Sequence, residues 1–106
     1  MRKLLLSLCL VGASAHADFR TGNELLEDTR SGSGVRQMFT AGYVSGVFDS
    51  TRGIVHCAPG TATVGQVTDM VENYLLVNPG ERNNPGAIIV MHVMQRQWPC
   101  KKGSTL

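Results

Sequence analysis

Only two cysteines, Cys57 and Cys100, remain in this chain once its first 17 residues are set aside. Those residues have the features of a secretory leader: a basic start, an apolar run too short to span a membrane, and the small residues of Ala15-His16-Ala17, a pattern that signal peptidase recognises. Leaders this short are typical of bacteria. We therefore predict cleavage after Ala17, export to the periplasm, no membrane anchor, and a mature chain of residues 18–106.

An even pair of cysteines in an oxidising compartment is expected to form a disulfide, here Cys57–Cys100. In the chain-entropy model, closing a loop of about 44 residues removes roughly 4 kcal/mol of freedom from the unfolded chain. This is a large share of the stability of a domain too small to depend on its core alone.

The alternative is a small hydrolase in which Cys57 is the nucleophile and His56 or His92 is its base. Adjacent side chains point in different directions in most backbones, and no orienting Asn is evident. We therefore predict a disulfide at Cys57 and no enzyme activity.

The mature chain has no net charge, because Arg2 and Lys3 leave with the leader and eight basic residues then balance eight acidic ones. Phosphate binding needs clustered Lys and Arg, and Lys101-Lys102 is the only basic pair, so nucleic acid is excluded as a partner. With the cysteines paired and few histidines left, no metal site and no other cofactor are predicted.

Two capping boxes mark helix starts. In this S/T-x-x-E/Q spacing, two side chains satisfy the first free amides of a helix, and it occurs at Thr21–Glu24 and at Thr63–Gln66. The first box predicts a short helix that reaches about Arg30. The second predicts a helix that stops at Asn78-Pro79-Gly80, because the residue before a proline is driven out of the helical region.

The last segment is apolar enough to be a strand or a helix. Ile88 to Met94 contains several β-branched residues, which favour a strand. Asn84 and Pro85, however, provide an N-cap followed by a proline at the first helical position, and Gly86 to Gln97 has the length of a helix. We predict a helix, so that the domain is all-α, with four helices stapled by one disulfide.

The second helix is predicted from Val35 to about Arg52, with apolar or small residues on both sides, and is therefore expected to be buried nearly all round. Gly42 and Gly46 lower its helix propensity by about 1 kcal/mol each, and close approach of a neighbouring backbone is the expected compensation. Two apolar helices are hard to hide in one small core. One alternative is a compact monomer in which glycines allow close helix packing. The other, which we predict, is a homodimer face formed by this helix or by the segment from Ile88 to Met94.

Six short motifs, taken in order, resemble the Tai/Rap immunity family over nearly the whole mature chain. They are Phe19–Leu26, Gly42–Asp49, Cys57–Pro59, Thr63–Gln66, Tyr74-Leu75 with Asn78-Pro79, and Trp98–Cys100. Members of this family are periplasmic helical proteins that neutralise peptidoglycan amidase effectors of type VI secretion. The resemblance implies an all-α fold, a Cys57–Cys100 bridge and a homodimer. Many relatives carry a second cysteine pair, near the end of the first helix and early in the second, and this chain has no cysteine there.

The resemblance also implies a function: the chain would bind an amidase effector and occlude its catalytic cleft with a rigid segment. One candidate is the connector, residues 52–60, with Arg52 and His56 as contact residues. The other is the polar turn, residues 78–84, with Glu81 and Arg82 as contact residues and prolines at Pro79 and Pro85 to stiffen it. A small periplasmic chaperone of the acid-stress type and an orphan helical binding module are the alternatives.

Overall fold

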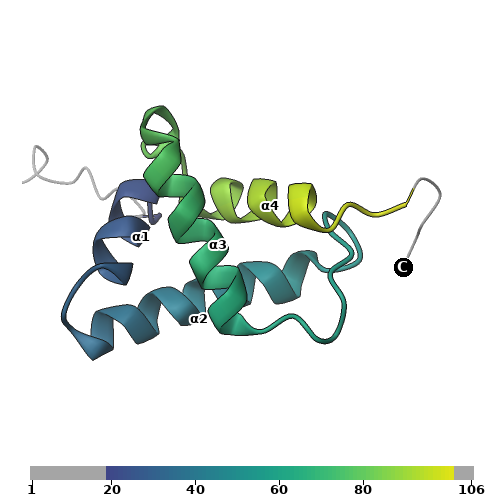
Figure 1. Ribbon diagram of the computed structural model, residues 1–106, viewed down its shortest axis with the longest axis horizontal. Coiled ribbons are helices and arrows are strands. Elements are labelled where there is room, and N and C mark those ends of the chain that lie inside the picture. Colours follow the sequence, from purple (N-terminus) through teal and green to yellow (C-terminus); the bar gives the residue numbers. More distant parts are fainter. Residues whose placement is uncertain (1–18, 102–106) are drawn as a thin grey trace, which may run out of the picture.

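The computed structural model describes residues 19–101, and within this range the fold is the predicted all-α one (Figure 1). The helices are α1 (Gly22–Thr29), α2 (Gly34–Thr51), α3 (Val64–Val77) and α4 (Gly86–Gln97), with a short 3₁₀ turn, η3 (Pro79–Glu81), before α4. The segment from Ile88 to Met94 lies within α4 and is helical, as predicted. The predicted cleavage site after Ala17 lies outside the described residues.

Both predicted capping boxes are confirmed. At α1 the Thr21 hydroxyl accepts a hydrogen bond from the Glu24 amide at 3.3 Å, and the Glu24 carboxylate accepts one from the Thr21 amide at 3.2 Å. At α3 the Thr63 hydroxyl accepts from the Gln66 amide at 3.1 Å, and the Gln66 side chain accepts from the Thr63 amide at 2.9 Å. These local signals therefore set where α1 and α3 begin.

The predicted bounds of α4, Gly86 to Gln97, are confirmed, but its predicted cap is wrong. Its N-cap is Pro85 rather than Asn84, and no side chain caps the helix. Pro85 is extended because it forms an antiparallel bridge with Thr21, and the amide of Gly86 donates to the carbonyl of Arg20 at 2.6 Å. A partner distant in the sequence thus replaces the local cap that the sequence offered.

The start of α1 is tied closely to the chain between α3 and α4. The amide of Gly22 donates to the carbonyl of Asn84 at 3.0 Å, and the amide of Asn23 donates to that of Arg82 at 2.8 Å. A methyl group at Gly22 would lie 2.9 Å from the Arg82 carbonyl oxygen and 2.8 Å from a methyl of Leu75. Glycine is therefore needed here for close approach of two backbones.

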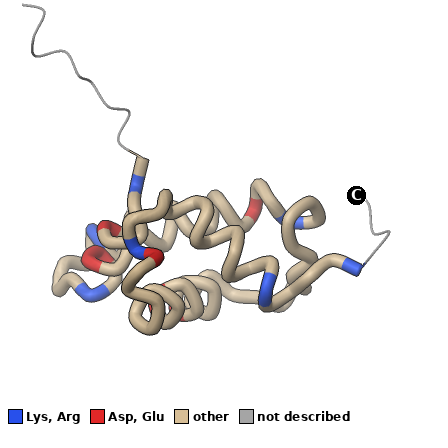
Figure 2. The backbone as a smooth tube through the Cα atoms, turned by 90° about the horizontal axis from the view of Figure 1, so that it is seen from above, with Lys and Arg blue, Asp and Glu red and all other residues tan. Residues whose placement is uncertain are grey.

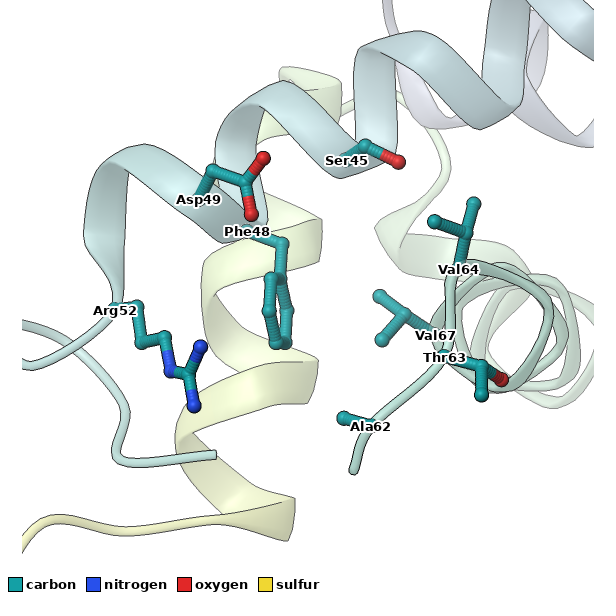
Figure 3. A pocket seen from close by; sticks show the side chains of 8 residues that line it. All are labelled: Ser45, Phe48, Asp49, Arg52, Ala62, Thr63, Val64 and Val67. Carbon is teal, nitrogen blue, oxygen red and sulfur yellow. The ribbon is translucent and has the colours of Figure 1, made fainter. Parts of the chain in front are cut away.

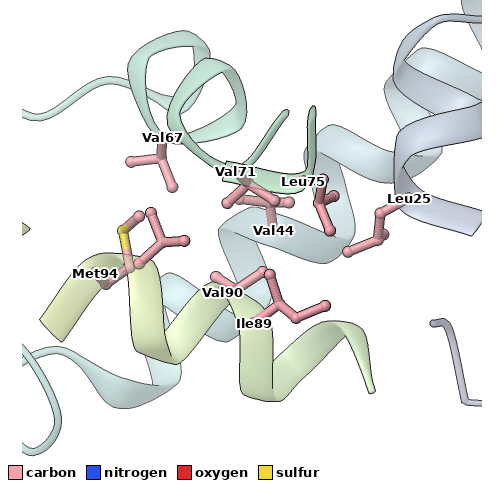
Figure 4. Close-up of a cluster of buried hydrophobic side chains, with 9 residues drawn as sticks. Leu25, Val44, Val67, Val71, Leu75, Ile89, Val90 and Met94 are labelled. Carbon is pink, nitrogen blue, oxygen red and sulfur yellow. The ribbon is translucent and has the colours of Figure 1, made fainter. Parts of the chain in front are cut away.

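The hydrophobic core lies where α3 crosses α2 and α4 (Figure 1), and it draws side chains from all four helices (Figure 4). Its buried members are Leu25, Val44, Val67, Val71, Leu75, Ile89, Val90, Val93 and Met94. On α3 the buried residues recur every four positions, which is one face of an amphipathic helix. The core fixes α3 across the other helices. The connector after α2 and the polar turn after α3 lie outside the core and form exposed segments.

The end of α1 and the start of α2, the two regions where this chain has no second cysteine pair, are joined by ion pairs instead. The buried carboxylate of Asp28 on α1 accepts from Arg36 of α2 at 2.8 Å and lies 3.2 Å from a guanidinium nitrogen of Arg20. Arg36 also binds Glu27 at 2.9 Å, and its hydrogen bonds to Glu27 and then Asp28 raise its pKa above the ordinary value. Figure 2 shows acidic and basic positions interspersed at this end of the molecule. This network holds α1 against the start of α2.

The expectation that α2 is buried nearly all round is wrong. Only Thr40 and Val44 of its 18 residues are buried. Gly42 and Gly46 are exposed, and a methyl group added at either would meet no atom within 4 Å. The helix packs against the other three from one side only, so its glycines face outward, and no backbone among residues 19–101 approaches them.

Candidate interaction surfaces

The connector is covalently fixed at one end of the domain. The predicted Cys57–Cys100 disulfide is confirmed, with the two Cα atoms 4.9 Å apart, and the Cys57 amide donates to the carbonyl of Trp98 at 2.8 Å. Gly53, at a φ of 80°, provides the left-handed turn that follows α2. Because the Cys57 thiol is bonded, the hydrolase alternative loses the nucleophile on which it depended.

His56, one of the predicted contact residues, belongs to the connector, and its side chain is fully buried. Its Nε2 lies 3.0 Å from the carbonyl oxygen of Phe48, and its Nδ1 accepts from the amide of Ala58 at 3.3 Å. A carbonyl only accepts and an amide only donates, so the ring carries its hydrogen on Nε2. The Phe48 ring packs on it, with centroids 4.6 Å apart. His56 therefore shapes the connector from within and has no surface to offer a partner.

Arg52, the other contact residue predicted in the connector, is exposed at the end of α2. Its Nε donates to the carbonyl of Ala58 at 3.1 Å, which holds the side chain along the connector. Arg52 and Asp49, one turn earlier, stand beside a hollow between α2 and the start of α3 (Figure 3). The guanidinium is thus positioned by the fold and still open to solvent.

The polar turn is rigid because its own side chains brace it. Arg82 donates from Nε to the carbonyl of Leu75 at 2.7 Å and from a terminal nitrogen to that of Leu76 at 3.2 Å. Asn83 accepts from the Asn23 side chain at 2.8 Å. Glu81 is exposed at the tip. Of the two contact residues predicted here, Glu81 is available to a partner, whereas the Arg82 guanidinium holds the turn together.

The structure places the two candidate segments at opposite ends of the domain. In Figure 1 the connector lies beside the end of α4, and the polar turn lies above α1. Their anchors agree with this, because the connector is bonded to Cys100 after α4 and the turn is bonded to Asn23 in α1. Arg52 and His56 therefore belong to one surface and Glu81 and Arg82 to another.

A third surface runs along the outward side of α2, and we call it the outer stripe. Its members are exposed apolar residues followed by exposed glycines: Val35, Met38, Phe39, Gly42 and Gly46. Val35 and Met38 have more than three quarters of their surface exposed, at 78% and 76%. Their spacing of three and four residues puts the members on one face of the helix. An exposed apolar face of this kind is a candidate interaction surface.

Two exposed residues of interest were missed from the sequence. Ile54, at the tip of the connector, has 67% of its surface exposed, and Asp49 lines the hollow beside Arg52. Ile54 follows Gly53 in the turn, and this apolar residue next to a turn glycine was the signal that could have found it. No comparable signal marks Asp49, because its position depends on how α2 meets α3.

Two classes of site find no support in residues 19–101. No group of three or more His, Cys, Asp or Glu side chains there could hold a metal ion. Within the same range no helix is long and apolar enough to cross a membrane. The candidate interaction surfaces are the two end segments and the outer stripe, and further apolar residues are exposed singly at Phe19, Val64, Leu76, Val77 and Ile88.

Comparison with known families gives one result. The sequence profile of the family described as Rap1a immunity proteins matches residues 21–100, from the N-cap of α1 to the second cysteine of the disulfide. No match was found among curated proteins.

Proposed function

Because this chain belongs to the family of Rap1a immunity proteins, we propose that it protects its cell by binding a toxic effector protein, specifically a peptidoglycan amidase delivered by type VI secretion. The family match over residues 21–100 is the observation that carries this proposal, since it spans all four helices and the disulfide. The proposed compartment is the periplasm, where a peptidoglycan amidase acts. The Cys57–Cys100 disulfide supports it, because such bonds persist in oxidising compartments.

The proposed mechanism is occlusion of the amidase cleft by the polar turn. This turn projects beyond α3 and α4 (Figure 1), and its hydrogen bonds to α1 and α3 fix its shape before binding. A preorganised segment loses little conformational freedom on association, which favours affinity. Glu81 is exposed at its tip and is the residue we expect to contact the effector.

The test is a charge reversal that leaves the hydrogen bonds of Arg82 intact and removes, within the turn, the one that the Glu81 carboxylate accepts from the Asn84 side chain. Glu81→Lys should weaken effector binding at least about tenfold, because it introduces repulsion where the account places a complementary contact. Arg82 is left unchanged, since its loss would loosen the turn itself. Asp69→Lys, on the exposed side of α3, is the matched control and should bind as the native chain does. Equal affinity of the Glu81→Lys and control variants would remove the turn from the mechanism.

A homodimer through the outer stripe is the second part of the proposal. In an antiparallel pair of α2 helices centred near Gly42, the large Met38 of one copy would lie over Gly46 of the partner subunit. Large side chains opposite glycines allow two helices to approach closely. The exposed apolar area of the stripe supports this arrangement, because a monomer would leave it in water.

The variant Gly46→Leu distinguishes an effect on dimer formation from an effect on the fold of the monomer. Nothing lies within 4 Å of a Cβ atom added at Gly46, and leucine favours helix more than glycine does, so the monomer should gain stability by up to about 1 kcal/mol. The same side chain would block the paired helix. We expect analytical ultracentrifugation to show a dimer for the native chain and a monomer for the variant. A thermal melt should show that the variant is the more heat-stable of the two. A native protein that is strictly monomeric at high concentration contradicts the dimer.

The antiparallel arrangement would also bring different ends of the two copies together. The start of α2 lies on the same half of the domain as α1 and the polar turn (Figure 1), whereas the end of α2 carries the connector. Pairing the helices head to tail therefore places the turn half of one copy beside the connector end of its partner. One effector would then be able to reach both surfaces.

A further inference from the structure

The hollow between α2 and α3 has the size of one aromatic ring. It encloses about 160 Å³ and is lined by Ser45, Phe48, Asp49, Arg52, Ala62, Thr63, Val64 and Val67. A protein cavity of roughly 150 Å³ is large enough to hold benzene. The hollow therefore fits a single six-membered ring that enters from the surface.

The inner walls of the hollow are apolar. Figure 3 shows Phe48 of α2 facing Val64 and Val67 of α3 across the gap, with Ala62 at its lower edge. Phe48 is already held in place by His56 and by Trp98, whose ring meets it edge-on at 6.3 Å between centroids. A ring that entered the hollow would thus pack against a fixed aromatic face, an arrangement that stabilises aromatic pairs.

The rim of the hollow carries two charges that do not pair with each other. Asp49 forms no hydrogen bond or ion pair with any of residues 19–101, and Arg52 uses only its Nε, for the carbonyl of Ala58. A carboxylate only accepts hydrogen bonds and a guanidinium only donates them. A hydroxyl is able to bind both kinds of side chain, because it donates to a carboxylate and accepts from a guanidinium.

We propose that this hollow receives a tyrosine side chain from a segment of a partner protein. The phenol ring would fill the apolar part, and its hydroxyl would lie between Asp49 and Arg52. A phenylalanine would fill only the apolar part, and a lysine or glutamate would pair with only one of the two charged side chains. Tyrosine is also among the residues that most often carry the binding energy of protein interfaces.

This inference deepens the proposed function and rests on it for the identity of the partner, because the segment would belong to the effector. The hollow lies at the connector end of the domain, beside a wider and more open hollow that shares Asp49 and Arg52 with it and is otherwise lined by Gly53, Cys57 and Ala58. The disulfide that fixes the connector therefore also fixes one side of the proposed contact.

The first test needs no effector and uses p-cresol, the side chain of tyrosine, as the probe. Titration into the native protein should shift the amide resonances of residues 45–49 and 62–67 in a saturable way, with an affinity of about millimolar. Toluene, which lacks the hydroxyl, should bind more weakly. Asp49→Asn should weaken p-cresol binding about three- to tenfold, because a neutral acceptor replaces a charged one and forms a weaker hydrogen bond. Asp69→Asn, an exposed acid on α3 away from the hollow, is the matched control.

The absence of any saturable shift up to the solubility limit of p-cresol overturns the proposal. Equal binding of toluene and p-cresol overturns the role given to Asp49 and Arg52. Circular dichroism of each variant establishes that it is folded, and Asp49→Asn changes only an exposed side chain, so the test does not depend on a variant that risks unfolding.

The second test uses the effector and separates this inference from the proposed function. Ala62→Phe places a ring at the edge of the hollow and should reduce capture of an amidase effector at least about tenfold. If the native chain captures the effector and Ala62→Phe captures it equally, the hollow is not the contact although the function stands. If the native chain captures no amidase while p-cresol still binds, the proposed function fails and the hollow remains a tyrosine site for another protein.

Discussion

Removal of the Cys57–Cys100 bond should destabilise the domain by about 4 kcal/mol. The two cysteines are 43 residues apart in sequence, and the chain-entropy relation gives roughly 13 cal/mol/K for a loop of this length, or about 4 kcal/mol at 25 °C. For a domain of this size, each kcal/mol lowers the melting temperature by about 4–8 °C. The expected decrease is therefore about 16–32 °C, which would leave the domain close to unfolding at growth temperature.

The variant to use is Cys57→Ser with Cys100→Ser, compared with the oxidised native chain. Cys57 is exposed and Cys100 is half-buried, so the serines add no buried polar group and the loss reports the crosslink itself. Urea unfolding followed by circular dichroism gives both the free energy and its slope with denaturant. The slope should be larger in the variant, because an unfolded chain without the crosslink exposes more surface.

Two results would refute the reasoning. A loss below about 1 kcal/mol would mean that the unfolded chain is not constrained by the bond. In that case the connector would be held by the packing of His56 on Phe48 and by the hydrogen bond from Cys57 to Trp98. An unchanged slope together with a large loss would place the effect in the native state, contrary to the entropic account.

Two further substitutions test how the helices are joined, each in a thermal melt beside a matched control. Gly22→Ala should cost about 1–3 kcal/mol of stability, because its methyl group would press on the Arg82 carbonyl oxygen. In the control, Gly65→Ala, the methyl group meets no atom within 4 Å and should not destabilise the domain. Equal melting temperatures would show that the contact between α1 and the chain before α4 adjusts easily. Asp28→Asn should cost about 1.5–3 kcal/mol, because a buried carboxylate loses its charge-assisted hydrogen bonds. Glu27→Gln, a change in a side chain that is 71% exposed, should alter stability little, and equal losses would mean that burial does not strengthen the network.

The parts of this fold that depend on neighbouring residues could be predicted from the sequence. Thr21 and Thr63 cap their helices through bonds that span three residues, so their spacing alone identified the starts of α1 and α3. The disulfide also followed from the sequence, because only two cysteines remain beyond the leader. Local chemistry and simple counting were sufficient in these cases.

The parts that depend on how helices meet could not be predicted. The apolar and small residues of α2 gave no way to distinguish a buried face from an outward one, because periodicity reports a face and not its neighbour. Asn84 looked like an N-cap, but the bridge between Pro85 and Thr21 sets the start of α4. Helix-forming signals are weak beside tertiary contacts of this kind.

The candidate site divides in the same way. The connector and the polar turn were both identified as exposed segments, and Glu81 is exposed as a contact residue needs to be. His56 and Arg82 were expected to contact a partner, but both serve internal hydrogen bonds. Their partners are carbonyls eight and seven residues away, which the sequence does not mark. The hollow between α2 and α3 was missed because it exists only where two helices pack.

Capture of an amidase effector by the native chain tests directly whether this protein acts as an immunity protein. The native chain, expressed in the periplasm and shown to be folded and disulfide-bonded, would be mixed with candidate peptidoglycan amidase effectors of type VI secretion, and both binding and peptidoglycan cleavage would be measured. The account predicts tight, salt-resistant capture of one effector with loss of its amidase activity. Amidases that all remain uncaptured and fully active in the presence of the folded, oxidised protein would contradict the account.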